Sequence, residues 1–517
     1  MKHSQGYSGE LPPARFNMAR YCLERAARMT PDKVALIVVS DAHAPKLAAE
    51  QWSYARLNEA VRRVAAGLRQ LGLGPAARIM IRMGNTSDYA LLFFGAMAAG
   101  YVPLPSSAQL TREEADFLLA NSGAQVIAMS DELVMESPPG VMALGPADLA
   151  NWRAACAPLD YTDTAATDPA FLVYTSGTTG QPKGVLHAQR SAWGRRPMYQ
   201  GWYGISADDV MLHAGAFNWT YTLGVGLTDP WANGATAVLY NGPRDITIWP
   251  MLLEKFRATL FAAVPGLYRQ MLKYNDLRAF DLSSLRHGLT AGEALNVALL
   301  EQWRTTTGKE LYEALGMSEC STYISSPPGR PIRPGSPGQA QPGRCVAILP
   351  VESGCDPLPP GEIGLLAVHR SDPGLMLGYW NRPDEEDLVY RGDWFIGGDL
   401  AHFDTDGYLH YHGRNDDVMN AMGYRVSPLE VEQCLSRHPA VAEAAVTEVP
   451  VREGVTVIAA FIVPRDPDEM DAAPLLAYAH EHLAAYKCPR EIIFINSLPR
   501  TANGKVRRRD LARELPH

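Results

Sequence analysis

The sequence predicts an α/β protein with a large N-terminal domain of layered sheets and helices and a small, hinged α+β C-terminal domain. Its 517 residues, of which 47% are hydrophobic, are enough for several compact units with substantial cores. Over roughly the first 400 residues, helical patterns alternate with short β-rich runs, which is typical of layered folds with largely parallel sheets. Near residue 413 a polar stretch punctuated by glycines ends this alternation, and the pattern after it differs.

Apolar periodicity predicts several elements of the N-terminal domain, which we expect to span residues 1–413. Residues 54–73 place apolar side chains on one helical face and end at glycines. The apolar run from Tyr89 contains glycines and is shorter than the about 20 residues that span a bilayer, so it predicts a buried helix and a following strand and no membrane insertion. Strands are predicted at residues 77–83 and 235–240, and a helix at residues 249–258.

A hinge at residues 414–420 and a C-terminal domain at residues 421–517 are predicted from the change in pattern. Ser427 can cap a helix that begins at Pro428, and Glu430 would complete a capping box. Two β-rich runs, a helical run and a short strand follow, which together make a self-sufficient unit of about 100 residues.

Composition excludes several classes of protein. The net charge of −9 and the isoelectric point of about 5.8 do not favour a nucleic-acid surface. The seven cysteines are scattered and form no CxxC pair, so we expect reduced thiols, not a disulfide framework or a zinc site. The first ten residues contain no apolar segment, so no signal peptide is expected and a cytoplasmic location is predicted.

A loop rich in glycine, serine and threonine occupies residues 174–184, which read YTSGTTGQPKG. It follows an apolar run that predicts a buried strand, and residues 185–194 after it are compatible with a helix. A glycine-rich loop between a strand and a helix leaves backbone N–H groups free to surround an anion. The loop fits neither the GxxxxGK[ST] pattern nor the GxGxxG pattern, so it predicts another class of phosphate-binding loop.

This loop resembles the signature of the AMP-forming adenylating superfamily, which contains acyl-CoA synthetases, peptide-synthetase adenylation domains and luciferases. Five more segments resemble that family in order, namely TAGEAL (290–295), LGMSE (315–319), FIGGDL (395–400), GRNDDVMNAMGYR (413–425) and LPRTANGKVRRRDL (498–511). The family often stacks an aromatic residue on adenine where this chain has Leu315. That difference and the AGEAL wording look more like the benzoate-CoA ligase and medium-chain acyl-CoA ligase branch. The resemblance implies ATP, Mg²⁺ and coenzyme A as cofactors.

The resemblance also implies a nucleotide site built from these segments. Asp399 and Arg414 would hold the ribose hydroxyls, and Arg425 would lie near phosphate. The complete implied set is Thr175, Ser176, Gly177, Thr178, Thr179, Gly180, Lys183, Gly292, Glu293, Ala294, Leu315, Gly316, Ser318, Asp399, Arg414 and Arg425.

Three residues are implied in catalysis: Lys505 as a mobile lysine, Glu319 as the carboxylate that binds Mg²⁺, and Thr175 in the phosphate loop. A substrate carboxylate has a pKa near ~4 and is ionised at neutral pH, so its attack on ATP needs no general base. The site must instead hold two anions together while pyrophosphate leaves. Lys183 would add positive charge or stiffen the loop. The resemblance implies that the small domain then rotates about Asp416, which withdraws the lysine and opens a coenzyme A tunnel at Gly423 and Tyr424.

The acid would lie between residues 217–224, residues 264–268 and the ends of the TAGEAL and LGMSE segments. These positions offer no clear cation or carboxylate, so the resemblance implies a neutral apolar guest, either an aromatic acid or a compact medium-chain acid. The implied acid-contacting residues are Phe217, Trp219, Tyr221, Val264, Gly266, Ala291, Gly316 and Met317.

The sequence therefore predicts an ATP-dependent, AMP-forming acid–CoA ligase. The alternative is a stand-alone adenylation enzyme that loads a carrier protein, because both share the first half-reaction. A catalytically silent nucleotide-binding regulator is disfavoured. Such a protein would have replaced one of the motif residues, but Thr175, Glu319, Asp399 and Lys505 are all present. The expected partners are small molecules, and a homodimer is compatible with the resemblance. His402, His410 and His412 are expected in a β-hairpin with ordinary hydrogen-bonding roles, although a metal pair is conceivable there.

Overall fold

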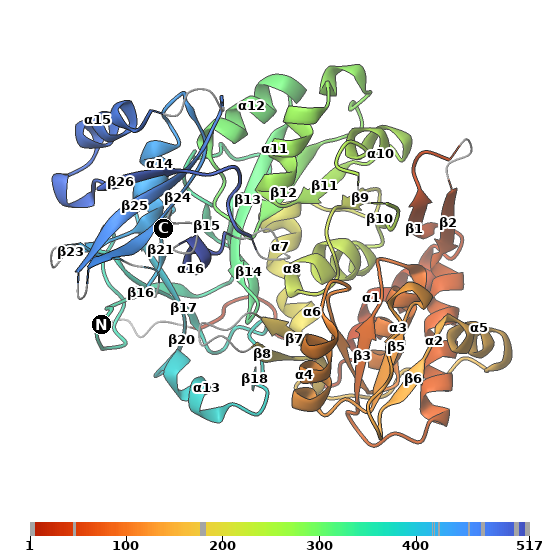
Figure 1. The fold of residues 1–517 in the computed structure, drawn as a ribbon. Helices are drawn as coiled ribbons and strands as arrows, with labels where there is room; N and C mark the ends of the chain where they lie inside the picture. Colours follow the sequence, from red (N-terminus) through yellow and green to blue (C-terminus); the bar gives the residue numbers. More distant parts are fainter. Residues whose placement is uncertain are drawn as a thin grey trace.

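A computed structural model of the chain describes residues 6–44, 48–175, 182–243, 245–415, 417, 419–421, 424–452, 455–466, 471–500 and 506–511. It has a large N-terminal body of several sheets and helices and a smaller C-terminal unit with its own sheet (Figure 1). The predicted fold class is confirmed. No helix among the described residues is long and apolar enough to cross a membrane.

The largest sheet has nine strands in the order β15–β14–β13–β12–β11–β9–β10–β1–β2. The pairings from β13 through to β1 are parallel, and the outer pairings at both ends are antiparallel. The strands are β1 (Val34–Asp41), β2 (Ala48–Ser53), β9 (Val210–His213), β10 (Thr236–Tyr240), β11 (Leu260–Ala263), β12 (His287–Ala291), β13 (Glu310–Met317), β14 (Ser321–Ser325) and β15 (Gln339–Ala340).

Helices cover both faces of this sheet, as the alternation in the sequence predicts. On one face α10 (Trp249–Lys255), α11 (Pro265–Tyr274) and α12 (Val297–Thr307) share a core with the central strands. The opposite face is covered by η2 (Tyr199–Tyr203), α8 (Thr220–Leu223) and η3 (Gly224–Thr228). The remaining short elements of the body are α6 (Ser191–Gly194), α7 (Arg196–Met198), α9 (Asp229–Ala232), η1 (Asp131–Leu133) and η4 (Leu277–Ala279).

A second, four-stranded sheet is entirely parallel, in the order β4–β3–β5–β6. Its strands are β3 (Arg78–Arg82), β4 (Val102–Pro105), β5 (Val126–Met129) and β6 (Met142–Leu144), and the helices of this region are α1 (Met18–Met29), α2 (Tyr54–Gln70), α3 (Ser87–Ala98), α4 (Arg112–Ser122) and α5 (Pro146–Ala155). The periodic apolar positions of α2 are buried, and α3 is buried along nearly its whole length, which confirms both predicted helices.

Two antiparallel sheets complete the body. One contains β7 (Pro169–Thr175), β8 (Lys183–Ala188) and β18 (Gly378–Tyr379). The other contains β16 (Val346–Leu349), β17 (Gly364–His369), β19 (Tyr390–Arg391), β20 (Trp394–Phe403) and β21 (Leu409–Arg414), with α13 (Pro383–Val389) beside it. The β20–β21 pair is the predicted hairpin.

The C-terminal unit packs three helices against a three-stranded sheet. Its elements are β22 (Met419–Ala421), β23 (Tyr424–Val426), α14 (Pro428–Leu435), β24 (Val441–Arg452), β25 (Val455–Pro464), α15 (Ala472–His482), η5 (Ala485–Lys487), β26 (Glu491–Phe494) and α16 (Arg508–Leu511). The apolar positions of β24 and β25 alternate between two small cores, one under α14 and α15 and the other under α16. The strands and helices predicted after residue 427 are therefore present.

Two local predictions are wrong. Residues 185–194 do not form one helix after the phosphate loop, because residues 185–188 lie in β8 and pair with β7 and β18, and only Ser191–Gly194 are helical, in α6. Burial between two strands outweighs the helical propensity of so short a run. Ser427 does not cap α14, because its hydroxyl instead donates to the carbonyl of His412. The helix does begin at Pro428, as predicted.

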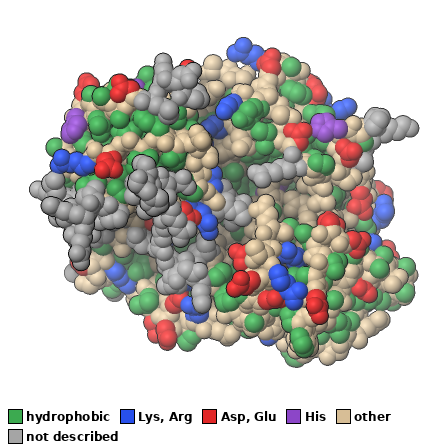
Figure 2. Space-filling view, in the orientation of Figure 1, with side chains coloured by type: hydrophobic (Ala, Val, Ile, Leu, Met, Phe, Trp, Pro, Cys, Tyr) green, Lys and Arg blue, Asp and Glu red, His purple; other side chains and the backbone are tan. Residues whose placement is uncertain are grey.

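Charges of both signs are interspersed over the described part of the face in Figure 2, and neither sign gathers into a large patch. This distribution agrees with the modest negative net charge and offers no basic surface for a nucleic acid on that face.

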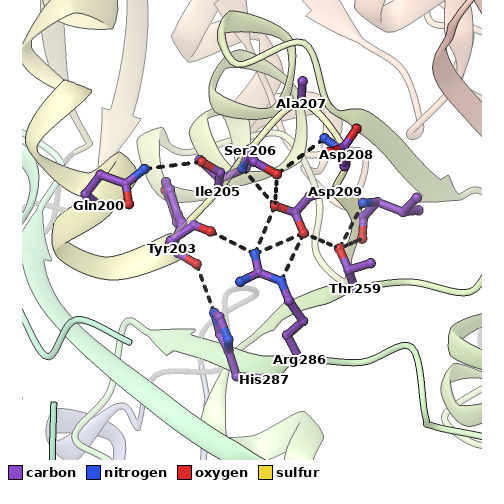
Figure 3. Close-up of polar contacts among 12 residues, drawn as sticks. Gln200, Tyr203, Ile205, Ser206, Ala207, Asp208, Asp209, Thr259, Arg286 and His287 are labelled. Carbon is purple, nitrogen blue, oxygen red and sulfur yellow. Dashed lines mark hydrogen bonds and ion pairs between the residues drawn. The ribbon is translucent and has the colours of Figure 1, made fainter. Parts of the chain in front are cut away.

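One buried carboxylate ties together the amino ends of three parallel strands (Figure 3). Asp209 directly precedes β9 and accepts hydrogen bonds from Arg286 Nη2 at 2.9 Å and Thr259 Oγ1 at 2.6 Å. Arg286 directly precedes β12 and Thr259 directly precedes β11. The backbone N–H of Ser206 donates to the same carboxylate at 2.8 Å, so Asp209 also fixes the turn that enters β9.

Replacing this carboxylate should destabilise the fold. Asp209→Ala should lower the free energy of unfolding by about 2–3 kcal/mol, because several donors lose a charged acceptor at once. The neighbouring Asp208 is exposed, and Asp208→Ala should change the free energy of unfolding by less than about 0.5 kcal/mol. Urea denaturation of the two variants measures the difference, and equal midpoints would contradict the role given to Asp209.

Candidate functional site

The predicted phosphate loop connects two antiparallel strands. Thr175 is the last residue of β7 and pairs with Lys183, the first residue of β8. The Lys183 ammonium forms a close ion pair with Glu385 in α13 and lies 5.7 Å from the ring centre of Tyr379. Burial would raise the pKa of Glu385, but the hydrogen bond and charge of Lys183 outweigh it and the pKa is lowered. Lys183 therefore braces the hairpin against α13.

The predicted metal-binding carboxylate contacts this hairpin through a tyrosine. The Tyr379 hydroxyl donates to Glu319 Oε1 at 2.7 Å, and Tyr379 pairs with Val185 of β8. Burial and the negative charge of Glu319 raise the pKa of Tyr379, so its hydroxyl keeps the proton that it donates. The structure thus brings the LGMSE segment and the phosphate hairpin together, although about 140 residues separate them in sequence.

A buried histidine contacts the backbone of the same segment. His187 Nε2 lies 2.8 Å from the carbonyl oxygen of Ser318, which accepts its N–H. Burial lowers the pKa of His187 to about 4, so the ring is neutral at physiological pH. The backbone N–H of Met376 also donates to the carbonyl of Glu319 at 2.7 Å. The backbone on either side of the carboxylate is therefore held.

Two buried ion pairs flank the residues that follow Glu319. Arg344 pairs with Asp372 at 2.7 Å, both side chains fully buried, and its second nitrogen donates to the carbonyl of Gly194. Arg195 pairs with Asp229 at 2.6 Å and donates to the hydroxyl of Ser321, which has a φ of +66°. A cavity of about 20 Å³, large enough for one water molecule, is lined by Arg195 and Ser321 among others.

The two residues implied in ribose binding lie side by side. Asp399 in β20 and Arg414 in β21 are cross-strand partners, and Arg414 Nη1 is 3.6 Å from Asp399 Oδ1. The Tyr411 hydroxyl donates to the same carboxylate oxygen at 3.1 Å. Gly397 is next to Met317, since a Cβ on this glycine would lie 2.5 Å from Met317 Cε. This pair therefore borders the LGMSE segment.

The TAGEAL turn follows β12 and lies beside the end of β13. Gly292 has a φ of +97°, which favours glycine, and a Cβ there would lie 3.0 Å from Trp219 Cη2. The backbone N–H of Leu295 donates to Glu313 Oε1 at 2.9 Å, so a carboxylate in β13 holds the turn. Burial raises the pKa of Glu313 to about 7.

Two ion pairs connect the C-terminal unit to this turn and its neighbour α11. Arg500 Nη1 lies 3.0 Å from Glu293 Oε1, and Arg500 Nη2 lies 2.9 Å from Glu443 Oε2. Glu443 also pairs with Arg269 of α11 at 2.7 Å. The loop that leads to the predicted mobile lysine is thus anchored at the predicted adenine turn.

The residues implied in acid binding are brought together in part. Trp219 contacts Gly292 and meets Tyr221 edge to face, with ring centres 5.1 Å apart. Tyr221 shares a core cluster with Ala291, and Phe217 stacks on His213. Gly266 lies in the first turn of α11, and a Cβ built there would contact nothing within 4 Å.

Comparison with known proteins identifies the family. Residues 23–380 match the family model of the AMP-binding enzymes, and residues 430–505 match that of the AMP-binding enzyme C-terminal domain. The chain belongs to the AMP-binding enzyme family. The predicted resemblance is therefore confirmed.

Named relatives of this AMP-binding enzyme cover nearly its whole length. It is 34% identical over 495 residues to a human mitochondrial acyl-coenzyme A synthetase, covering 89% of this chain and 84% of that protein. It is 30% identical over 478 residues to a 3-hydroxybenzoate–CoA ligase of Aromatoleum, covering 88% of this chain and 90% of that protein. A benzoate CoA ligase structure from Burkholderia xenovorans aligns with a TM-score of 0.86 and 31% identity, covering 96% and 100%. The structure of an anthranilate CoA ligase with anthranoyl-AMP aligns with a TM-score of 0.88 and 28% identity, covering 97% of this chain and 98% of that chain.

Several predicted site residues of this AMP-binding enzyme lie outside the described residues. They are Ser176, Gly177, Thr178, Thr179 and Gly180 of the phosphate loop, Asp416, Gly423 and Lys505. For Tyr424 and Arg425 only the backbone, in β23, is described. Their roles stay predictions.

The three histidines of the hairpin contact one another. His402 Nδ1 lies 2.7 Å from His412 Nε2, and the rings of His402 and His410 stack with centres 4.7 Å apart. His410 Nε2 contacts Asp404 at 3.0 Å. Within the described part of the chain, no group of three or more potential ligands is arranged to hold a metal ion.

Sequence reasoning missed the supporting residues of the site. Tyr379, His187 and Glu385 act across long separations in the chain, and no local pattern marks them. Glu313 had one sequence signal, since it is a carboxylate in the interior of β13, between the apolar residues Tyr312 and Ala314.

The raised pKa of Glu313 predicts a pH-dependent stability. The folded state binds its proton more tightly than the unfolded chain, whose ordinary pKa is 4.5, so this contribution is complete below 4.5 and is lost as the pH rises through 7. Glu313→Gln should remove this loss of stability at high pH, because glutamine does not ionise. Its stability relative to the wild type should rise by about 1–3 kcal/mol between pH 5 and pH 8.

Urea denaturation at both pH values measures this difference. Glu362 is exposed, and Glu362→Gln serves as the matched control, for which the difference should stay constant. If the difference in stability between Glu313→Gln and the wild type were also the same at both pH values, the raised pKa of Glu313 in the folded state would be contradicted.

Proposed function

We propose that this protein is an AMP-forming acid–CoA ligase that activates an aromatic or medium-chain carboxylic acid. The acid would attack ATP to give an acyl-adenylate and pyrophosphate, and coenzyme A would then displace AMP to give the thioester. The observation that carries the proposal is the contact between Glu319 and Tyr379, because it joins the metal-binding segment to the phosphate hairpin. The acyl-CoA and aromatic acid–CoA ligases among its relatives support this reaction class.

The first half-reaction is mainly a problem of charge. An ionised carboxylate must approach the α-phosphate of ATP, and a second anion must leave. Thr175 ends β7 where the phosphate loop begins, so its hydroxyl can donate to a phosphate oxygen. The hairpin is braced by Lys183 and Glu385, which reduces the reorganisation needed when the triphosphate binds.

The residues around Glu319 suit a hard divalent cation. Mg²⁺ prefers oxygen ligands and usually keeps several waters, and Glu319 supplies one carboxylate whose Oε1 is oriented by Tyr379. When bound there, Mg²⁺ would neutralise phosphate charge. The backbone contacts of His187 and Met376 hold the carboxylate in place before any substrate arrives.

The nucleoside would lie between the β20–β21 pair and the TAGEAL turn. Asp399 and Arg414 lie side by side and would hold the ribose hydroxyls. Glu293 already receives Arg500 from the C-terminal unit, so the adenine turn and the lysine-bearing loop are linked. Lys505 follows Arg500 by five residues and would deliver the positive charge for adenylation. Rotation about Asp416 would then withdraw it and admit coenzyme A at Gly423 and Tyr424.

Product analysis tests the proposal directly. The protein is incubated with ATP, Mg²⁺ and a panel of benzoates, cinnamates and straight-chain acids, with either coenzyme A or a carrier protein bearing its pantetheine arm. Acid-dependent release of pyrophosphate and AMP together with a coenzyme A thioester is expected. A thioester on the carrier protein alone would assign the protein to the stand-alone adenylation enzymes, and no acid-dependent pyrophosphate release would overturn adenylation.

The two half-reactions should respond differently at Lys505. Lys505→Ala should abolish pyrophosphate release, by a factor of about 100 or more, because the charge that stabilises the departing phosphate is lost. Thioester formation from supplied acyl-adenylate should persist. Arg507 is an exposed basic residue of the same tail, and Arg507→Ala controls for general loss of charge. Equal loss of both half-reactions in Lys505→Ala would refute the assigned role.

A further inference from the structure

Two buried side chains in the acid-binding region carry polar atoms without partners. His213 is the last residue of β9 and is 1% exposed, and Tyr221 lies in α8 and is 5% exposed. Among the residues that the structure describes, the two ring nitrogens of His213 have no hydrogen-bond partner, and the hydroxyl of Tyr221 has none either. A buried polar group left in this state costs about 1–3 kcal/mol, so native proteins seldom keep one unless water or a ligand satisfies it.

Both groups are neutral. Burial lowers the pKa of His213 to about 3, and burial raises the pKa of Tyr221. No charged group contributes to either shift. A neutral imidazole offers one N–H donor and one acceptor nitrogen, and a phenol both donates and accepts.

Both side chains belong to the same face of the nine-stranded sheet. His213 pairs in register with Ala262 of β11, and Ala262 pairs with Leu289 of β12, so the three side chains point the same way. Tyr221 packs on that face with Ala262, Leu289 and Ala291. The rings of His213 and Tyr221 are 6.3 Å apart at an angle of 73°.

The position of this pair coincides with the residues proposed to bind the acid. Trp219 lies between Tyr221 and Gly292, and Ala291 ends β12 directly below that glycine. Ala262, Ala291 and Ala314 supply only small side chains on this face of β11, β12 and β13. Tyr221 is thus itself a predicted acid-contacting residue, and His213 stacks on another, Phe217.

Several neighbouring buried polar groups have hydrogen-bond partners within the protein. The Tyr203 hydroxyl donates to Asp229 at 2.7 Å. The backbone carbonyl of Tyr203 accepts a hydrogen bond from His287 (Figure 3). The Tyr268 hydroxyl donates to the carbonyl of Phe261 at 2.7 Å, and Trp202 Nε1 donates to the carbonyl of Tyr312 at 3.0 Å. These three residues pair their polar atoms within the protein, whereas Tyr221 and His213 do not.

We propose that the carboxylic acid substrate carries a neutral hydrogen-bonding substituent, a hydroxyl or an aromatic amino group, away from its carboxyl end, and that Tyr221 and His213 recognise it. The inference rests on the proposed acid–CoA ligase function and refines its substrate class. A second carboxylate or an aliphatic ammonium is excluded, because it would be a buried charge without a counter-ion. An unsubstituted acid leaves the two groups unpaired and binds less well.

Matched substrate pairs test this inference. Rates of coenzyme A thioester formation are compared for benzoate against 3-hydroxybenzoate, 4-hydroxybenzoate and 3-aminobenzoate, and for hexanoate against 6-hydroxyhexanoate. At least one substituted acid should exceed its parent in kcat/KM by about ten- to a hundredfold. Tyr221→Phe removes only the hydroxyl oxygen, and it should bring that ratio down at least about fivefold.

A second tyrosine provides the control. Tyr268→Phe also removes one buried hydroxyl, but this hydroxyl already has partners within the protein. It should lower thermal stability and leave the substrate ratio unchanged, whereas Tyr221→Phe should lower the ratio without lowering the stability of the ligand-free protein. His213→Phe, which keeps a ring of similar shape, should likewise lower the ratio.

Three outcomes overturn the inference while leaving the ligase function intact: every parent acid matches or exceeds its substituted partner, Tyr221→Phe keeps the wild-type ratio, or Tyr221→Phe loses as much thermal stability as Tyr268→Phe. The last result would mean that ordered water fills the hydrogen bonds. Failure of the proposed function itself looks different, because then no acid in the panel gives a thioester at all.

Discussion

The placement of Glu319 depends on polar groups that are buried around it. His187 holds the preceding carbonyl, Tyr379 donates to the carboxylate, and the Arg195–Asp229 pair contacts Ser321 just after it. Buried polar groups and charges are costly unless they are paired, so each of these contacts has essentially one acceptable geometry. The turn that would bind metal and phosphate is consequently shaped before ligands arrive, which is the arrangement that favours electrostatic catalysis.

The contacts that join the C-terminal unit to the body are of a different kind. The side chains of Arg269, Glu443, Arg500 and Glu293 are between 21% and 36% exposed, whereas Arg344 and Asp372 are fully buried. Partly exposed ion pairs contribute roughly 0–1 kcal/mol each and are screened by salt. Breaking a buried pair costs about 3–5 kcal/mol. The site is therefore held by strong contacts, whereas these ion pairs between the C-terminal unit and the body are weak, which is compatible with the proposed rotation.

The region proposed to bind the acid combines apolar packing with unpaired polar atoms. Its aromatic residues pack as a core, which agrees with the apolar guest expected from the sequence, yet Tyr221 and His213 keep neutral polar atoms on the same face. Such atoms cost stability while they are unpaired, and they discriminate between ligands that differ by a single hydroxyl. Specificity of this kind depends on where polar atoms lie, and residue type alone does not reveal it.

The sequence by itself determined the fold class, the family and the identity of the motif residues, because contiguous motifs and apolar periodicity are local properties. The helices at residues 54–73 and after Pro428 and the strands of the C-terminal unit followed from these patterns. Only the tertiary structure decided that residues 185–188 form a strand, that Ser427 caps no helix, and that Tyr379, His187 and Glu313 support the site. These outcomes depend on pairing and burial between segments far apart in the chain, and such partners become neighbours only after the layers have packed.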